Sequence, residues 1–383
     1  MLFDLDIKGD LLPPKTVCLT YDDGPGETDG PGPGPRTSAL GRFLYEQGIP
    51  ATFFVIGRHA EQHRGVLRQL RDWGHLVGNH TYSHPGLVGL ATSGGDVVGE
   101  LERTDRLIRD LSTGPFTFLR APYGNWREKR APGSDVDKHF SIVAGMLNRS
   151  GRFRHYVGPI NWDISSLDWE FWGRGDSGEQ CAAACLERVE RIGRGIILMH
   201  DSSEEAAVRA GNQTAEMTRI LVGALQERGY RFVGLDAIPQ VQSAMRVSAQ
   251  IRLRSPTGDF LMRTCDGTIS VCAASEDPSA LEEPFGLEQL GDGRIALRAA
   301  NGQYLSEQDG GERIIRAGPL VPGSSETLQI DDLGDGRAAL RTASGRYLTL
   351  QPGEVLRASG MTRSASETFV VHLPANNAGV AGS

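Results

Sequence analysis

The sequence predicts two domains, a barrel of parallel strands with outer helices followed by an all-β trefoil. The chain has 383 residues, more than one hydrophobic core usually holds, so two domains are expected. Up to about residue 237, short apolar runs alternate with stretches whose apolar residues recur at helical spacing. After about residue 246 that spacing ends and one pattern recurs three times. We therefore assign 1–245 to the barrel, 246–373 to the trefoil and 374–383 to a disordered tail.

Seven apolar runs are expected to form the strands of the barrel domain. In chain order they are TVCLTY, ATFFVIG, HLVGN, FTFLR, YVGPINW, GIILMH and YRFVGL. Helical patterns such as SALGRFLYEQG and AAACLERVERIG lie between them. Strands separated by helices predict a parallel sheet. Helices that all lie outside it would close the sheet into a distorted (β/α) barrel with one unit fewer than usual.

Chemically capable side chains follow these strands at their carboxyl ends. They are Asp22 and Asp23 after TVCLTY, His80 and His84 after HLVGN, Arg120 at the end of FTFLR, and His200 at the end of GIILMH. In a β/α barrel those ends form one rim, where the active site lies. This convergence favours a closed barrel over an open doubly wound sheet.

The second domain repeats itself. The glycines Gly258, Gly302 and Gly345 are 44 and 43 positions apart, and an aromatic residue follows each of them two positions later. TG, NG and SG turn signals lie between runs of alternating hydrophobicity, which indicates hairpins. Three such units stacked around a shared core predict a β-trefoil.

Composition limits the possible partners. Hydrophobic residues make up 39% of the chain and charged residues 23%, as in soluble globular proteins. The net charge is −8 and the basic residues are scattered, which argues against nucleic acid or an anionic membrane as a partner. No apolar run reaches the ~18 residues of a membrane span. The start lacks a signal-peptide pattern, so we expect a cytoplasmic protein if Met1 is the native start, and an extracellular one if the start is trimmed.

The five cysteines contain no C-x-x-C pair, which argues against a zinc ribbon. Cys181 and Cys185 lie one helical turn apart and are expected to be small core residues. Cys265 and Cys272 flank the DG of a predicted hairpin, so a disulfide between them stays open as an alternative.

Each rim motif has a structural explanation when it is taken alone. TYDDGP suits a turn, and H-x-x-x-H in a polar loop is a weak metal signal. Arg120 can pair with surface carboxylates, and His200 can be a satisfied core residue. Their joint occurrence in this order is what indicates a functional site.

The ordered motifs resemble those of the polysaccharide deacetylases of the NodB-homology type, carbohydrate esterase family four. The matching segments are TYDDGP from Thr20, HTYSH from His80, RAPY from Arg120, SSLDW from Ser165 and LMH from Leu198. The resemblance spans roughly Thr16 to Leu235. The second domain resembles a fascin-like trefoil, because LGDGR-x-ALR-x-A-x-G-x-YL occurs at both Leu290 and Leu333.

The resemblance implies that Asp23, His80 and His84 bind a divalent metal and leave an open position for water. Zn²⁺ is the expected ion, with Co²⁺, Ni²⁺ or Mn²⁺ as alternatives. Two imidazoles and one carboxylate suit zinc, and three protein ligands plus water are typical of a catalytic site.

The resemblance also assigns roles around the metal. Asp22 would be the general base that takes a proton from the metal-bound water, and Arg120 would hold Asp22 in place. The backbone N–H of Tyr123 would stabilise the oxyanion, and His200 would protonate the departing amine. Trp169 and Leu198 would form an apolar pocket for the acetyl methyl group, with Asp168 also among the substrate-binding residues.

The chain departs from the family pattern at Ser165, where the family usually has an aspartate that orients the catalytic histidine. A serine cannot stabilise an imidazolium as a carboxylate does. Asp163 and Asp168 both lie nearby, and the sequence does not decide which one reaches His200. The segments 26–36 and 125–138 are expected to be rim loops that shape a sugar groove.

The expected function is therefore metal-dependent removal of acetyl from N-acetylated, rather than O-acetylated, sugars of a poly- or oligosaccharide. Chitin oligosaccharide and peptidoglycan are the expected substrates, and glycan binding by the trefoil is inferred by fold analogy. Two alternatives remain open. One is a catalytically impaired glycan-binding or scaffold protein, which Ser165 supports, and the other is an amidohydrolase of a small non-sugar amide.

Overall fold

The computed structural model describes residues 2–28, 33–112, 114–128, 141–264, 266–272, 284–308, 313–350 and 355–372. Contacts divide the chain into two compact units. Residues 6–128 and 141–242 form most of the first, and the described residues from Ser243 onward form most of the second. The predicted disordered tail, 374–383, lies outside the described residues.

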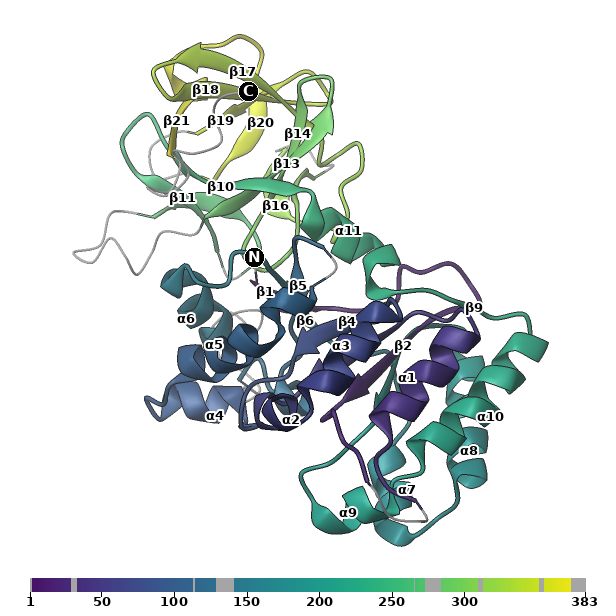
Figure 1. Ribbon diagram of the computed structural model, residues 1–383. Coiled ribbons are helices and arrows are strands. Elements are labelled where there is room, and N and C mark those ends of the chain that lie inside the picture. Colours follow the sequence, from purple (N-terminus) through teal and green to yellow (C-terminus); the bar gives the residue numbers. More distant parts are fainter. Residues whose placement is uncertain are drawn as a thin grey trace. The chain divides into compact units, whose positions relative to one another are not determined.

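Parallel strands form the centre of the first unit (Figure 1). They are β1 (Leu2–Ile7), β2 (Thr16–Asp22), β3 (Ala51–Val55), β4 (Leu76–Asn79), β5 (Thr117–Phe118), β6 (Tyr156–Ile160), β7 (Ile164–Ser165), β8 (Arg194–His200) and β9 (Arg231–Phe232). One sheet has the order β4-β3-β2-β8-β7, with β9 beside the start of β2, and the other has the order β1-β6-β5. A bridge between Asn79 and Leu119 joins them, so the strands form a distorted barrel.

Helices alternate with these strands. They are α1 (Thr37–Glu46), α2 (Gly57–Gln62), α3 (Arg64–Asp72), α4 (Leu87–Thr92), α5 (Val97–Ile108), α6 (Ile142–Ser150), α7 (Asp168–Arg174), α8 (Gly178–Ile192), α9 (Ala206–Gly211), α10 (Thr214–Glu227) and α11 (Pro239–Met245). In α8 the sequence determines both ends, because Ser177 and Gln180 form a capping box and Gly193 takes the left-handed conformation after the last turn. Among the described helices, none has the length and apolarity that a membrane crossing requires.

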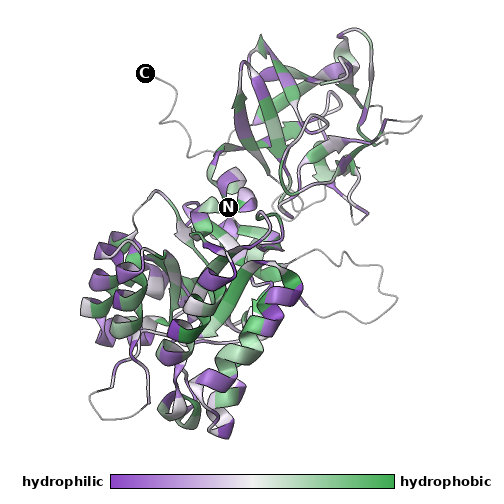
Figure 2. Cartoon of the chain, turned by 90° about the vertical axis from the view of Figure 1, so that its right-hand side faces the viewer, coloured by the Kyte–Doolittle hydropathy of each residue, from purple (hydrophilic) through white to green (hydrophobic). Residues whose placement is uncertain are grey.

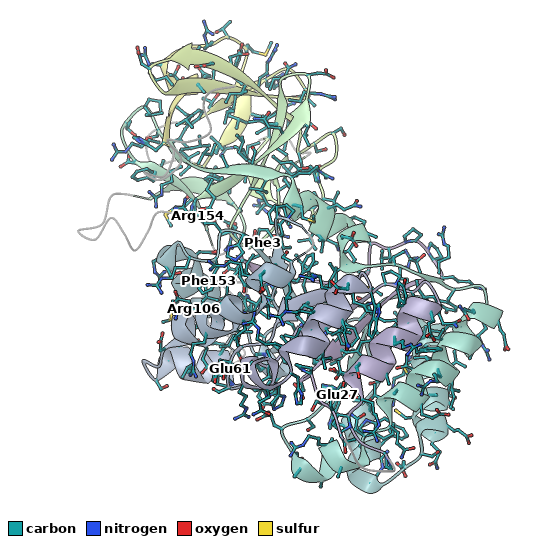
Figure 3. All side chains as sticks on the ribbon, in the orientation of Figure 1. Phe3, Glu27, Glu61, Arg106, Phe153 and Arg154 are labelled. Atoms are coloured by element: carbon teal, nitrogen blue, oxygen red, sulfur yellow. The ribbon has the colours of Figure 1, made fainter. Side chains whose placement is uncertain are left out.

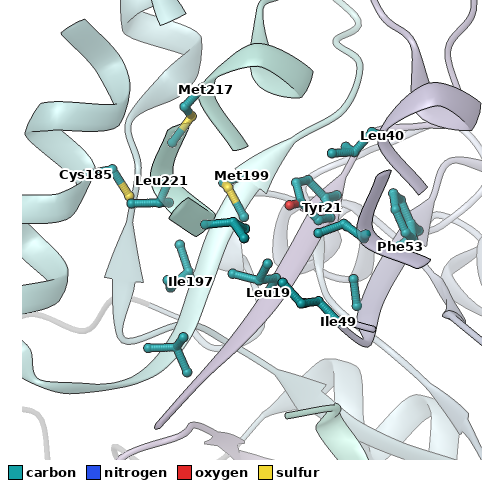
Figure 4. Close-up of a cluster of buried hydrophobic side chains, with 14 of the residues drawn as sticks. Leu19, Tyr21, Leu40, Ile49, Phe53, Cys185, Ile197, Met199, Met217 and Leu221 are labelled. Carbon is teal, nitrogen blue, oxygen red and sulfur yellow. The ribbon is translucent and has the colours of Figure 1, made fainter. Parts of the chain in front are cut away.

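The main core of the first unit lies between the larger sheet and helices such as α8 and α10 (Figure 4). Every residue of β2 is buried, as expected for a strand covered on both faces. Figure 2 accordingly shows hydrophobic central strands and helices of mixed character. Cys181 and Cys185 are buried, free and part of this core, which confirms the prediction for both. The possible disulfide between Cys265 and Cys272 lies outside the described residues.

The α/β barrel class predicted from the sequence is confirmed, and each of the seven predicted runs contains a strand. Two strands were not predicted. The first, β1, lies in the opening segment, where the sequence predicted neither a signal peptide nor a strand. It pairs in parallel with β6. The second, β7, has only two residues, too few to show a periodic pattern.

The second unit is an antiparallel all-β domain, in agreement with the predicted trefoil. Its strands are β10 (Val247–Arg254), β11 (Phe260–Arg263), β12 (Ile269–Cys272), β13 (Phe285–Gly291), β14 (Arg294–Arg298), β15 (Leu305–Glu307), β16 (Ile315–Ala317), β17 (Leu328–Gly334), β18 (Arg337–Thr342), β19 (Tyr347–Thr349), β20 (Arg357–Gly360) and β21 (Thr368–His372). The equivalent leucines of the three repeats, Leu253, Leu297 and Leu340, meet in one buried core. The last strand, β21, pairs with the first, β10, and so closes the domain.

The repeated SET segments have a structural role. Glu367 is 5% exposed, and its carboxylate accepts hydrogen bonds from the backbone N–H of Ser364 (2.8 Å) and from the hydroxyls of Ser366 (2.8 Å) and Thr349 (3.1 Å). Glu326 does the same in the preceding repeat, accepting from Ser306 and Gly323. The core of the unit is otherwise hydrophobic. Figure 3 draws the side chains of the described residues along the ribbon.

We expect Glu367→Ala to lower the free energy of unfolding of the second unit by about 2 kcal/mol, because buried donors lose a charged acceptor. Urea unfolding followed by circular dichroism measures this. Asp335→Asn removes the charge of a carboxylate that is 91% exposed but keeps a residue that tolerates the left-handed conformation there (φ 54°), and it serves as the control. Equal unfolding midpoints for the two variants would contradict the role assigned to Glu367.

Candidate active site

The turn after β2 places two carboxylates at the barrel rim. Asp22 ends the strand and is 3% exposed, and Asp23 follows it in a left-handed conformation with φ 75°. The next residue must be glycine, since a Cβ on Gly24 would lie 2.1 Å from Oδ2 of Asp201. The close approach explains why the motif continues DDG.

Asp23, His80 and His84 converge as the sequence predicts. One ligand atom from each lies within 4.8 Å of the other two. Oδ1 of Asp23 is 3.5 Å from Nε2 of His80 and 3.2 Å from Nε2 of His84. Among the described residues this buried oxygen has no hydrogen-bond partner. A buried acceptor without a donor, facing two imidazole nitrogens, fits a bound cation.

Neighbouring groups orient both imidazoles. Nδ1 of His80 donates to the carbonyl of Arg120 at 2.8 Å, so Nε2 is left as the ligand atom. Nδ1 of His84 lies 3.1 Å from the hydroxyl of Tyr123. Such contacts to the second ring nitrogen are typical of metal-binding histidines.

Protonation states suit a metal site. Burial lowers the pKa of His80 to about 4, which leaves the ring neutral and able to ligate. Burial alone would raise the pKa of Asp23, but the adjacent His84 ring and the charge of the nearby His200 hold that pKa below its usual range. The cluster therefore offers one carboxylate and two imidazoles, a donor set that suits Zn²⁺.

Arg120 holds Asp22, as expected. Its Nη1 donates to Oδ1 of Asp22 and to Oγ1 of Thr20, both at 2.8 Å. Its remaining nitrogens donate to the carbonyls of Ile160 and Asn161, each at 3.2 Å. The guanidinium is 1% exposed, and these bonds satisfy a charge that would otherwise be costly to bury.

Asp168 is the carboxylate that supports His200. Its Oδ1 accepts from Nδ1 of His200 at 2.8 Å, and its Oδ2 accepts from the backbone N–H of His200 at 2.6 Å. Asp163 instead accepts from the backbone of Gly9 and Ile196, and the hydroxyl of Ser165 accepts from the backbone of Leu167. Because Asp168 takes this position, Ser165 no longer argues for a barrel that has lost catalysis.

Placing Asp168 among the substrate-binding residues was wrong. The side chain is fully buried beneath His200, so it cannot contact a ligand. Burial alone would lower the pKa of His200, but the charge and hydrogen bond of Asp168 outweigh it and raise the pKa to about 10. His200 is therefore held protonated at neutral pH.

A pocket of about 480 Å³ opens over these groups. It is lined by Asp22, Asp23, His80, His84, Tyr123, Trp162, Trp169, Leu198, His200, Ser202, Ser203, Glu204, Glu205 and Val208. The predicted residues Trp169 and Leu198 are both present, and the Trp169 ring packs edge-on against His200 at 5.2 Å. The ring of Tyr123 is 72% exposed beside them.

Sequence reasoning missed the wall formed by Ser202 to Glu205. These residues directly follow the carboxyl end of β8, and that position alone could have indicated them. Glu204 pairs with Arg58 and lies 2.9 Å from Nε2 of His59. The predicted rim loops 26–36 and 125–138 lie partly outside the described residues.

The chain is similar to known polysaccharide deacetylases. A model of the polysaccharide deacetylase family matches residues 10–133, and a fascin domain model matches 266–371. A chitooligosaccharide deacetylase of Azorhizobium caulinodans is 31% identical over 223 residues, 56% of this chain and 90% of that protein. A peptidoglycan N-acetylglucosamine deacetylase of Listeria monocytogenes is 26% identical over 58% of this chain and 39% of that protein. The solved structure of the chitin deacetylase of Colletotrichum lindemuthianum aligns with 62% of this chain and with 90% of its own length. The sequence identity is 26% and the TM-score is 0.43.

The fold and the site thus define a sugar-modifying hydrolase built on a β/α barrel. The chain belongs to the polysaccharide deacetylase family and carries a fascin-like domain after the catalytic barrel. The resemblance stated from the motifs is confirmed for both halves.

We expect Asp168→Asn to move the alkaline limb of the pH–kcat profile to lower pH, because the pKa of His200 falls when the carboxylate is lost. A group whose pKa is raised stays protonated until the pH passes that value, so the variant loses its proton donor earlier. Acetate release measured across pH tests this. Asp163→Asn is the matched control and should leave the limb unchanged; a limb unmoved in Asp168→Asn would contradict the pairing.

Tyr123→Phe is expected to weaken metal binding about 10-fold, since His84 loses a partner that orients its ring. Competition with a chromogenic chelator measures the affinity. Tyr82→Phe removes a hydroxyl that donates to Glu61 at 2.8 Å rather than to a histidine of the cluster, and this variant should bind metal normally. Unchanged affinity in Tyr123→Phe would show that the contact does not position His84.

Proposed function

We propose that this enzyme removes acetyl groups from the nitrogen of N-acetylated sugars in an oligo- or polysaccharide and depends on a divalent metal. The observation that carries the proposal is the meeting of three parts at one pocket. These are the Asp23–His80–His84 cluster, the ion pair between Asp22 and Arg120, and the His200–Asp168 pair.

Asp23, His80 and His84 would hold the metal, and Zn²⁺ is the ion that their chemistry favours over Co²⁺, Ni²⁺ or Mn²⁺. When bound, such an ion acts as a Lewis acid toward water and toward a carbonyl oxygen. Asp23 and His80 are buried and His84 is partly buried, and all three line the pocket.

In this proposal Asp22 acts as the general base. Its Oδ2 lies 3.6 Å from Nε2 of His80, while its Oδ1 is engaged by Arg120. One oxygen is therefore fixed, and the other faces the cluster. From there it can take a proton from the water whose oxygen bonds to the acetamide carbonyl carbon.

In this proposal His200 acts as the general acid. Its Nδ1 proton is engaged by Asp168, so Nε2 is the atom that faces the pocket. That nitrogen can give its proton to the sugar nitrogen as the C–N bond breaks, which releases acetate and a free amine. The backbone N–H of Tyr123 is the proposed further donor to the oxyanion.

The pocket lining supports a sugar substrate. Tyr123, Trp162 and Trp169 surround the polar groups, and flat aromatic faces suit the apolar faces of sugar rings. Relatives named for chitooligosaccharide and for peptidoglycan support these two glycans as substrates. An amide target is favoured over an ester, because an amine leaving group needs the proton that His200 supplies.

Acetate release from chitin oligosaccharides, peptidoglycan and acetylated xylan, with and without a chelator, tests the proposal. His80→Ala should lose both the metal and the activity. Asp22→Asn should retain the metal and lose at least about 100-fold in kcat, since only the proton acceptor is removed. Normal turnover by Asp22→Asn, or full activity in excess chelator, would overturn the mechanism.

A further inference from the structure

The three trefoil repeats carry an equivalent set of three positions. An arginine precedes an aromatic residue by six positions in each repeat: Arg254 and Phe260, Arg298 and Tyr304, Arg341 and Tyr347. The third position lies on the neighbouring strand. It is the residue that pairs with the residue two positions before the arginine. His372 pairs with Arg252 there, Glu288 with Ala296, and Asp331 with Ala339. We refer to arginine, aromatic residue and opposite residue as the repeat triad.

In the second repeat the triad is filled by the chain itself. Glu288 and Tyr304 are fully buried, and the Tyr304 hydroxyl donates to Glu288. The Ser243 hydroxyl contacts both, donating to Oε2 of Glu288 at 3.1 Å. Nε of Arg246 lies 2.5 Å from Oε1 of Glu288. In the second repeat the Glu288 carboxylate therefore binds the hydroxyl of Ser243 and the guanidinium of Arg246.

In the third repeat the same chemistry is partly exposed. The Tyr347 hydroxyl donates to Oδ2 of Asp331 at 3.0 Å, and the side chains of both residues remain accessible. The guanidinium carbon of Arg341 lies 5.9 Å from the Tyr347 ring centre, compared with 5.3 Å between Arg298 and Tyr304. Within the part of the chain that the structure describes, the hydroxyl of Tyr347 is the hydrogen-bond partner of the Asp331 carboxylate, and no second hydroxyl or cation is bonded to it as Ser243 and Arg246 are to Glu288.

The first repeat lacks this chemistry. Phe260 has no hydroxyl, and the opposite residue is His372, whose ring centre lies 6.0 Å from that of Phe260. A hydroxyl and a cation would find no carboxylate there. The three repeats thus include one filled triad, one open triad and one without the polar pair.

We infer that the open triad of Asp331 and Tyr347 binds a ligand group that carries a hydroxyl beside a cation. An amino-sugar unit with a free ammonium group has this chemistry, and the choice of a sugar rests on the proposed function, whose product it would be. Asp331 accepts from the ammonium and a neighbouring hydroxyl, and the Tyr347 ring lies beside the sugar face. An acetylated sugar offers no cation, so the site distinguishes product from substrate.

Calorimetric titration of the full chain with glucosamine tetramer tests the inference. Asp331→Asn should weaken binding about 10-fold, because a charged acceptor is lost. Tyr347→Phe should weaken it less. Asp332→Asn is the matched control, since the adjacent strand residue loses the same charge on the opposite face of the strand. Binding at the catalytic pocket contributes equally to all variants, so the difference between Asp331→Asn and Asp332→Asn isolates the trefoil site.

Equal affinity of Asp331→Asn and Asp332→Asn would overturn the site. If Asp331→Asn weakens the binding of N-acetylglucosamine tetramer as much as it weakens the binding of glucosamine tetramer, the site does not select for the free amine. A short peptide containing Ser and Arg that binds in an Asp331-dependent manner, where the tetramer does not, would replace the sugar with a protein ligand. Acetate release by the same preparations is measured separately. Loss of acetate release would contradict the deacetylase proposal, whereas loss of Asp331-dependent binding would contradict only the trefoil site.

Discussion

The site depends on the burial of one charge. Arg120 is enclosed at the barrel rim, and a buried guanidinium is tolerated only when its donors are engaged. Its side chain engages Asp22, and its own carbonyl accepts from His80. One residue therefore positions both the proposed base and a proposed metal ligand. Arg120 follows β5, a strand of only two residues, and the bridge between Asn79 and Leu119 holds this segment beside β4.

Two carboxylates at the rim serve different purposes because their surroundings differ. Asp23 faces imidazoles and has an oxygen that no described donor engages, which suits a cation ligand. Asp168 is fully buried, and both of its oxygens are engaged by His200. Residue type alone does not separate these roles. Burial and the neighbouring donors do, as general electrostatic arguments lead one to expect.

The trefoil shows how a repeated sequence diverges while its core is retained. The leucines of each repeat remain buried together, since replacing them would open a cavity in a shared core. The residues that strand register makes equivalent outside this core have changed, from Glu288, which is fully buried, to Asp331, which is partly exposed, and to His372. Polar positions of this kind can diverge while the shared hydrophobic core preserves the fold.

The sequence by itself determined the fold class, the positions of the barrel strands other than β1 and β7, and the residues that meet at the rim. These depend on local rules, namely hydrophobic period, turn chemistry and the side of a sheet at which parallel strands end. Only the tertiary structure decided that Asp168, rather than Asp163, supports His200, and that Glu204 lines the pocket. Both facts depend on how segments far apart in the sequence pack against one another, and local sequence patterns do not encode this packing.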